Sequence, residues 1–292
     1  MYKNLFLLPF VVITCAISVP SFSRDINNPK EYVDFFRKVR CSIKDGEVTI
    51  GTWEGNMYSR VEGEKDRKLF KVLGMNINKC VSVTNEKKQV GYRSISRELM
   101  LYLDPDNSTV LKTWKNPWTG EEVEVVHVAN DPVNQKYADF GYDRSGKPST
   151  VALKDLGDVY GFNYEVPLFY NNPLAGEYQD YVGNHYHAME LFNFFVTKKD
   201  ADSKQDKVKY HIAWTRIAQW LPWMKMGSRP GLMVVNTQGK KVFKFEELDP
   251  ILVNAINTTY PLYKTAPPDN DARENETSWT VFKKYIDGKK TK

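Results

Sequence analysis

Short stretches of alternating apolar and polar residues, separated by turn-forming residues, dominate the chain from residue 46 onward and constrain its fold most strongly. The first stretch, Val48–Trp53, is followed by Gly55-Asn56, a pair typical of hairpin turns. Further strands are predicted at Met57–Val61, Lys68–Val83, Gly91–Leu103, Thr109–Trp114, Glu121–Asn130, His187–Val196, Val208–Trp220 and Gly231–Asn236. Because hairpin-length turns and no helices separate most of them, the pattern predicts an antiparallel meander, closed into a barrel or folded as a sandwich.

Helical patterns are confined to the two ends of the chain. Asn28-Pro29 is a good N-cap and first turn for a helix from Lys30 to about Cys41. Glu246–Tyr260 and Ser278–Ile286 predict one or two C-terminal helices. From Asp131 to Asn184 the pattern weakens, which indicates a long functional loop or a set of short strands.

The N-terminus has the order of a secretory signal. Lys3 precedes an apolar run from Leu5 to Val19, and small residues at Ser21 and Ser23 favour cleavage after Ser23. We therefore expect a signal peptide at residues 1–23, a single β-barrel domain at 24–292, and a secreted or periplasmic protein. The apolar run is short for a bilayer span, so no stable membrane span is expected after cleavage.

Two cysteines remain in the expected mature chain, Cys41 and Cys80. In an oxidising compartment they could form one disulfide, and the alternative is a pair of small buried thiols. The formal net charge of +5 is slight, and much of it sits in lysines of the C-terminal tail. No nucleic-acid motif accompanies that charge, so no nucleic-acid partner is expected.

Three polar side chains lie on strand faces that are otherwise apolar. By strand alternation, Arg97 shares a face with Leu99 and Leu101, Arg216 with Trp214, and His127 with Val125. A buried guanidinium is costly unless it is paired. Two explanations remain open for Arg97 and Arg216. In the first, they form ion pairs with carboxylates of the chain, such as Glu98, Glu165, Glu190 and Glu276. In the second, the interior is wet and the arginines meet a polar or anionic ligand group.

His185 and His187 are two of the four histidines and stand two residues apart at the start of a predicted strand. Residues at this spacing share a face, so the pair could bind a divalent metal with Glu190, perform proton transfer, or make structural hydrogen bonds. The pattern resembles the first half of the cupin metal motif. However, Glu190 comes one position too early after the pair, and strand alternation places it on the other face.

The stretch from Trp214 to Met226 is unusually rich in Trp and Met. These side chains offer broad, adaptable apolar surface, which suits either a ligand wall or a plug under one end of a barrel. The candidate residues are Trp214, Trp220, Trp223, Met224 and Met226. No nucleophile elbow, phosphate-binding glycine loop, Cys-x-x-Cys pair or His-Glu-x-x-His helix is present in the sequence.

Longer motifs carry a resemblance to a known family. The chain resembles the bacterial and fungal family named domain of unknown function 1838 in eight segments, namely Ser96–Glu98, Leu103–Pro105, Thr113–Glu121, His127–Asn134, His185–Glu190, Trp214–Ile217, Trp220–Gly227 and Asn275–Trp279. The resemblance implies one full-length domain, often exported, and it implies no activity. Gln219 stands where a glycine is expected in the tryptophan motif of the family.

We therefore expect a mainly β, calycin-like barrel with an N-terminal helix and one or two C-terminal helices. Its interior is expected to bind a small molecule with an apolar body and a polar or anionic group. Arg97 and Arg216 would orient that group, the Trp and Met residues would form the walls, and His127, His185 and His187 are the candidate catalytic residues. The alternatives are a metal-dependent enzyme that uses His185, His187 and Glu190, and an exported carbohydrate-binding or interaction module.

Overall fold

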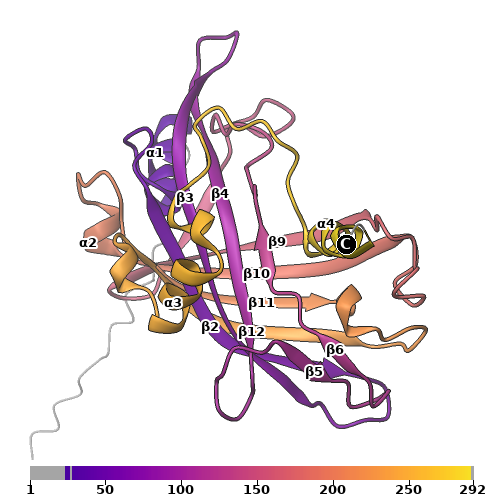
Figure 1. Cartoon of the computed structure of the whole chain (residues 1–292). Helices are drawn as coiled ribbons and strands as arrows, with labels where there is room; N and C mark the ends of the chain where they lie inside the picture. The colour runs from indigo at the N-terminus through magenta and orange to yellow at the C-terminus, as the bar shows by residue number, and fades with distance from the viewer. Residues whose placement is uncertain (1–23, 27, 291–292) are drawn as a thin grey trace, which may run out of the picture.

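The computed structural model describes residues 24–26 and 28–290, so the predicted signal peptide at 1–23 lies outside the described residues. One large antiparallel sheet organises this part of the chain (Figure 1). Its strands follow the order β1-β8-β9-β10-β11-β12-β2-β3-β4-β7. Their bounds are β1 (Arg24–Ile26), β2 (Thr49–Arg60), β3 (Lys68–Thr84), β4 (Val90–Leu103), β7 (Val128–Asn130), β8 (Val151–Asp155), β9 (Val159–Asn171), β10 (His185–Thr197), β11 (His211–Ala218) and β12 (Leu232–Val242). A separate two-stranded sheet pairs β5 (Thr113–Lys115) with β6 (Glu122–Glu124).

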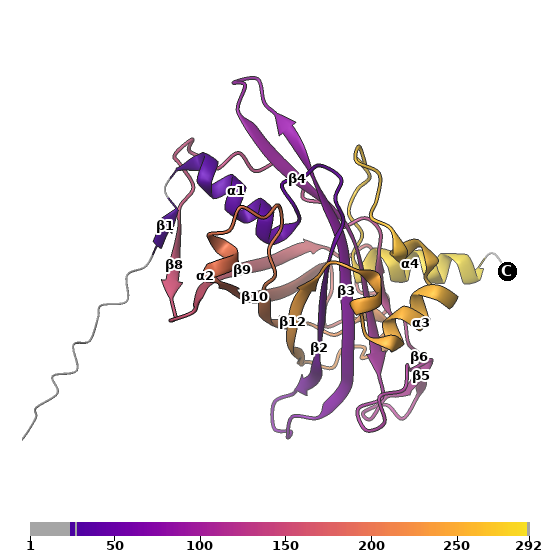
Figure 2. The same ribbon diagram turned by 90° about the vertical axis from the view of Figure 1, so that its left-hand side faces the viewer.

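The mainly antiparallel β architecture is confirmed, but the sheet does not close into the expected barrel. β1 and β7 stand at opposite ends of the strand order, and neither pairs with the other within the described residues. The sheet is nevertheless strongly curved: Figures 1 and 2 show β2, β3 and β4 running across β9 to β12. We call the concave side of this curve the inner face and the convex side the outer face.

The predicted helices are found near the two ends of the chain, and short helices also occur between strands. α1 (Pro29–Arg40) begins at Asn28, whose side chain accepts a hydrogen bond from the backbone N of Lys30. The other α-helices are α2 (Lys198–Ala201), α3 (Pro250–Thr258) and α4 (Ser278–Lys290), and the short 3-10 helices are η1 (Pro222–Met224), η2 (Phe245–Glu247) and η3 (Pro261–Lys264). None of the described helices is long and apolar enough to cross a membrane.

The structure corrects two predicted boundaries. The turn predicted at Gly55-Asn56 is wrong, because both residues lie inside the continuous strand β2. A Cβ at Gly55 would come within 2.1 Å of the backbone O of Asn236, so glycine serves close approach of β12 here and not a turn. The weakly patterned region between Asp131 and Asn184 contains β8 and the long strand β9.

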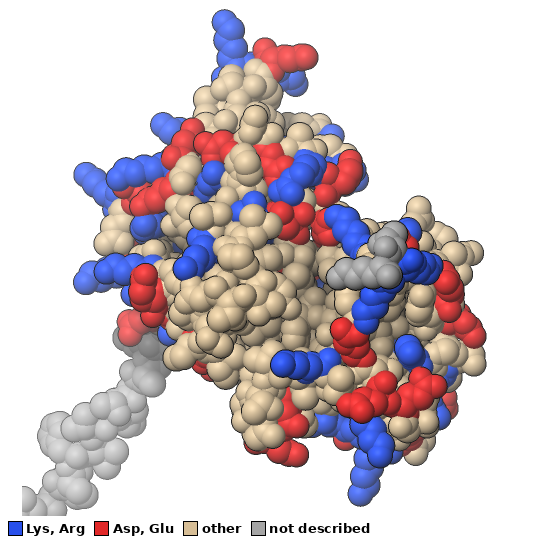
Figure 3. All heavy atoms as spheres, in the orientation of Figure 1, with Lys and Arg blue, Asp and Glu red and all other residues tan. Residues whose placement is uncertain are grey.

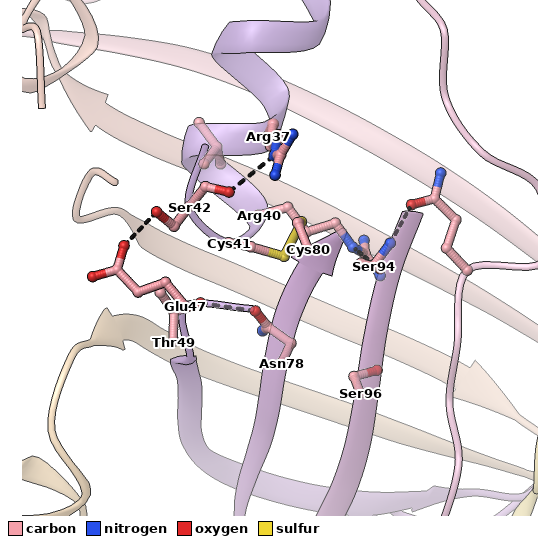
Figure 4. Close-up of a disulfide and its surroundings, with 12 residues drawn as sticks. Arg37, Arg40, Cys41, Ser42, Glu47, Thr49, Asn78, Cys80, Ser94 and Ser96 are labelled. Atoms are coloured by element: carbon pink, nitrogen blue, oxygen red, sulfur yellow. Dashed lines mark hydrogen bonds between the residues drawn. A yellow bond between two sulfur atoms is a disulfide. The ribbon is translucent and has the colours of Figure 1, made fainter. Parts of the chain in front are cut away.

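Lys241 and a disulfide fix the C-terminal end of α1 to the sheet. Lys241 of β12 is buried, and its Nζ donates hydrogen bonds to the backbone carbonyls of Lys38, Val39 and Cys41. An ammonium group suits this place because the last carbonyls of a helix lack intrahelical donors and carry partial negative charge. Cys41 and Cys80 form a disulfide that joins the same helix end to β3 (Figure 4).

The two faces of the sheet are covered by different elements. On the outer face, α3 packs on β3 and β4 through a cluster that includes Leu99, Leu101 and Leu252. On the inner face, α1 fills one end, and an aromatic cluster with α4 fills the other. The middle of the inner face therefore lies between two packed ends.

Replacing Lys241 with Met should lower the free energy of unfolding by about 2–4 kcal/mol, because buried carbonyls at the end of α1 lose their donor. Chemical denaturation measures the change. Lys240→Met is the matched control, since Lys240 is the exposed neighbour on the same strand. Equal stability of the two variants would contradict the anchoring role of Lys241.

Candidate functional site

An ion pair lies on the inner face near the middle of the curved sheet. Arg216 of β11 and Glu190 of β10 are direct neighbours in the strand register, and Arg216 Nη1 donates to Glu190 Oε1 at 3.0 Å. Their side chains remain 22% and 16% exposed, so solvent reaches them from inside the curve. The structure thus gives Arg216 one of the carboxylate partners that the sequence suggested.

A second carboxylate enters the same region from the other side of the curve. Glu98 of β4 lies opposite Asn130 of β7, and Asn130 Nδ2 donates to Glu98 Oε2 at 3.0 Å. Burial, and secondarily the neighbouring Glu190 carboxylate, raise the pKa of Glu98, while Arg216 and Asn130 oppose that rise. Glu98, Asn130, Glu190 and Arg216 together form what we call the inner cluster.

Tyrosines surround the inner cluster. The Arg216 guanidinium lies 6.0 Å from the ring centre of Tyr186, which also contacts the rings of Tyr170 and of Trp279 on α4. Burial raises the pKa of Tyr186 and of Tyr102, so both phenols stay neutral near neutral pH. The Tyr186 hydroxyl donates to the backbone O of Gln219 at 3.3 Å. The cluster is therefore bounded by neutral aromatic rings on several sides.

A row of aromatic rings continues along the inner face from the cluster. Trp53, Trp214, Phe192 and Phe194 follow one another with ring centres 5.9, 6.3 and 6.4 Å apart. Trp214 is buried, whereas the other three are partly exposed. The indole Nε1 atoms of Trp53 and Trp214 have no hydrogen-bond partner. We call this row the aromatic ladder; it offers apolar surface, and its two unpartnered indole donors are buried.

The predicted wall residues divide between the ladder and a packed end. Trp214 belongs to the ladder, but Trp220, Trp223, Met224 and Met226 are buried in the cluster that fills one end of the inner face. The Trp223 ring packs against Phe70, Tyr102 and Trp114. Asn116 Nδ2 donates a hydrogen bond to the backbone O of Met224 at 2.9 Å. We call these four residues the plug. Their burial agrees with the alternative that the sequence left open, in which they fill one end of the fold and do not form a ligand wall.

Arg97 does not share the inner face with Arg216. It projects from β4 to the outer face, where its Nε donates to Asp131 Oδ1 at 2.6 Å and its Nη1 to the backbone O of Thr265 at 2.5 Å. The side chain is buried and paired, so the expectation that both arginines face one interior is not met. The reason is that β4 is buried on both faces, one under α3 and the other inside the curve.

A surface hollow of about 430 Å³ lies beside Asp131 and is lined by Leu262, Arg273, Glu276 and Lys284 among others. Its charged side chains already pair with one another, Arg273 with Asp131 and Lys284 with Glu276. The hollow is wide and shallow, and its cations are satisfied. We therefore regard the inner cluster with its ladder as the better candidate site.

The candidate metal ligands are separated by the sheet. His185 and His187 are exposed on the outer face of β10, where the Phe169 ring stacks at 4.8 Å from His185 and meets His187 edge-on at 4.6 Å. Glu190 lies on the inner face with Arg216. A single ion could not contact all three residues, and the described residues contain no group of three or more metal-ligating side chains. The prediction that His185, His187 and Glu190 bind one metal ion is therefore wrong.

Sequence reasoning missed Asn130, Trp53, Phe192 and Phe194 as parts of the site, and it named Glu98 only as an ion-pair partner. The available signal was strand parity, since Phe192 and Phe194 share a face with Glu190. Asn130 gave no such signal, because β7 is only three residues long.

His127 lies between β6 and β7, away from the other two candidate histidines, and its Nδ1 accepts a hydrogen bond from the backbone N of Tyr102 at 3.1 Å. Burial lowers its pKa from 6.5 to about 4, against a hydrogen bond with the Leu111 backbone. The ring is therefore neutral near pH 7 and serves as an acceptor.

The folded state disfavours the charged form of His127. The free energy of unfolding should therefore be highest above pH 6.5, and it should decrease by up to about 3 kcal/mol as the pH falls toward 4. His127→Asn keeps an acceptor but cannot titrate, so its unfolding free energy should fall less over this range. Urea denaturation at several pH values measures the difference. The exposed residue His211, changed to Asn, is the control; identical pH profiles for wild type and His127→Asn would refute this role.

Comparison with known proteins gives a family but no activity. No curated protein matches the chain significantly. The family model described as "Protein of unknown function (DUF1838)" matches residues 46–286, which include the whole inner cluster and the ladder. The chain therefore belongs to the DUF1838 family of proteins of unknown function.

Proposed function

We propose that the protein binds a small molecule along the inner face of its sheet, with an apolar body on the aromatic ladder and a polar group at the inner cluster. One observation carries the proposal. Trp53, Phe192 and Phe194 remain partly exposed beside a partly exposed ion pair on the concave face of the curved sheet. Aromatic rings and a few convergent polar groups in a concave place are typical of ligand sites.

The surrounding elements support this position for the ligand. α1 and the plug cover the two ends of the inner face, so the ladder and the inner cluster occupy the interval between them. Figure 3 shows charged side chains gathered over the β3–β4 hairpin and around α4, with mostly uncharged atoms between them.

Export is part of the proposal. The signal-like N-terminus favours secretion or a periplasmic location, and the Cys41–Cys80 disulfide suits an oxidising compartment. A calycin-like relationship stays a prediction, supported by the antiparallel order from β2 to β4.

A surface-binding function is the second candidate. Phe169 is 63% exposed on the outer face, and Met189 and Ile217, also exposed, lie on neighbouring strands beyond it. An exposed aromatic ring flanked by His185 and His187 could stack on a sugar or a partner surface. Phe169→Ala would abolish glycan binding in that case and leave inner-face binding unchanged.

Nile red, a neutral apolar dye, should bind saturably to purified protein and fluoresce strongly. Val166→Trp should weaken this binding by about tenfold or more, because Val166 lies beside Glu190 on the inner face and a larger side chain fills that space. Asn163→Trp is the control, since Asn163 is exposed on the opposite face of β9. Undiminished binding by a folded Val166→Trp variant would overturn the proposed site.

A further inference from the structure

Asn130 has an unsatisfied acceptor in the inner cluster. The residue is only 6% exposed, and its Nδ2 is used by Glu98. The Oδ1 of the same amide is buried and has no hydrogen-bond partner. A buried acceptor without a donor is unfavourable, so a ligand that brings an N–H or O–H donor to this amide would be favoured.

The charges of the inner cluster favour the same kind of group. Glu98 and Glu190 are two carboxylates that face a single guanidinium, that of Arg216, which already pairs with Glu190. The other titratable groups that interact with this region are the neutral tyrosines 102, 170, 186 and 263. Burial favours the protonated form of Glu98, in which the cluster carries no net charge, and ionised Glu98 gives the cluster a net charge of −1.

An added carboxylate would leave this partly buried place with at least one uncompensated negative charge. An added ammonium group would be neutralised when Glu98 releases its proton to solvent. Unpaired charge away from water is costly, so the two ligand classes differ strongly in their expected affinity.

We propose that the molecule bound at the inner face carries a protonated amine, which donates to the Glu98 carboxylate and to Asn130 Oδ1. This inference rests on the proposed function, and it puts a cationic group in place of the polar or anionic group expected from the sequence. The ligand class is thus an amine with an apolar body.

Three probes of nearly equal shape separate the possibilities: phenylbutylamine, phenylbutanol and phenylbutyrate. Isothermal titration calorimetry at neutral pH should show the amine binding at least about tenfold more tightly than phenylbutyrate, because only the amine is neutralised by Glu98. Titrations in two buffers with different heats of ionisation should show that amine binding releases a proton. Affinity for the amine should also rise with pH while Glu98 is still being deprotonated.

Glu98→Gln should weaken amine binding by about tenfold and remove the proton release, while phenylbutanol binding stays unchanged. Glu165→Gln is the matched control, since Glu165 is exposed on the outer face of β9. Should Glu98→Gln fail to fold, the proton release and pH dependence of the wild type still decide.

Equal affinities for the three probes, or tighter binding of phenylbutyrate, would overturn the amine inference and leave the proposed function standing. Absence of binding by all three probes would count against the proposed function itself. Unchanged amine binding by a folded Glu98→Gln variant would show that Glu98 is not the group that neutralises the ligand.

Discussion

The open edge of the curved sheet is the constraint on which the rest of the structure depends. A closed barrel covers its own interior, but this sheet ends at β1 and β7, so other elements must cover its apolar inner face. α1 does so at one end, held by Lys241 and the disulfide, and the plug with α4 does so at the other. The interval between them is where the protein keeps partly exposed aromatic rings and charge.

The inner cluster is stable because its charges compensate one another. Arg216 is paired with Glu190, and the remaining carboxylate, Glu98, has an amide partner and is shifted toward its neutral form. On the outer face, the charge of Arg97 is compensated separately by Asp131, and its guanidinium also donates to two backbone carbonyls. Arg97 and Arg216 are thus paired in two unconnected networks, and of these two only the inner one borders partly exposed aromatic rings.

Local pattern was enough to predict α1, the two C-terminal helices and most strands, but not the strands or faces that tertiary contacts decide. β9 alternates regularly from Phe162 to Tyr170, yet Pro167 argued against a strand. The proline is tolerated because β8 pairs only with residues 160 and 161 of β9, so β9 is an edge at Pro167. Similarly, parity identified Arg97 and Arg216 as polar groups on apolar faces, but β4 is buried on both sides, and no local pattern says which side is inner.

The clearest case of such a limit is the stretch around the two histidines. Spacing alone placed His185 and His187 together, and they do share a face, but it is the exposed outer one. Glu190, an odd number of residues after either histidine, must project to the other side of β10. There it meets Arg216, its register neighbour, and neutralises the one guanidinium of the inner cluster. The carboxylate that the spacing suggested for a metal site instead pairs with the partly exposed Arg216. Under the proposed function, this pairing leaves Glu98 as the carboxylate that is available to a ligand amine.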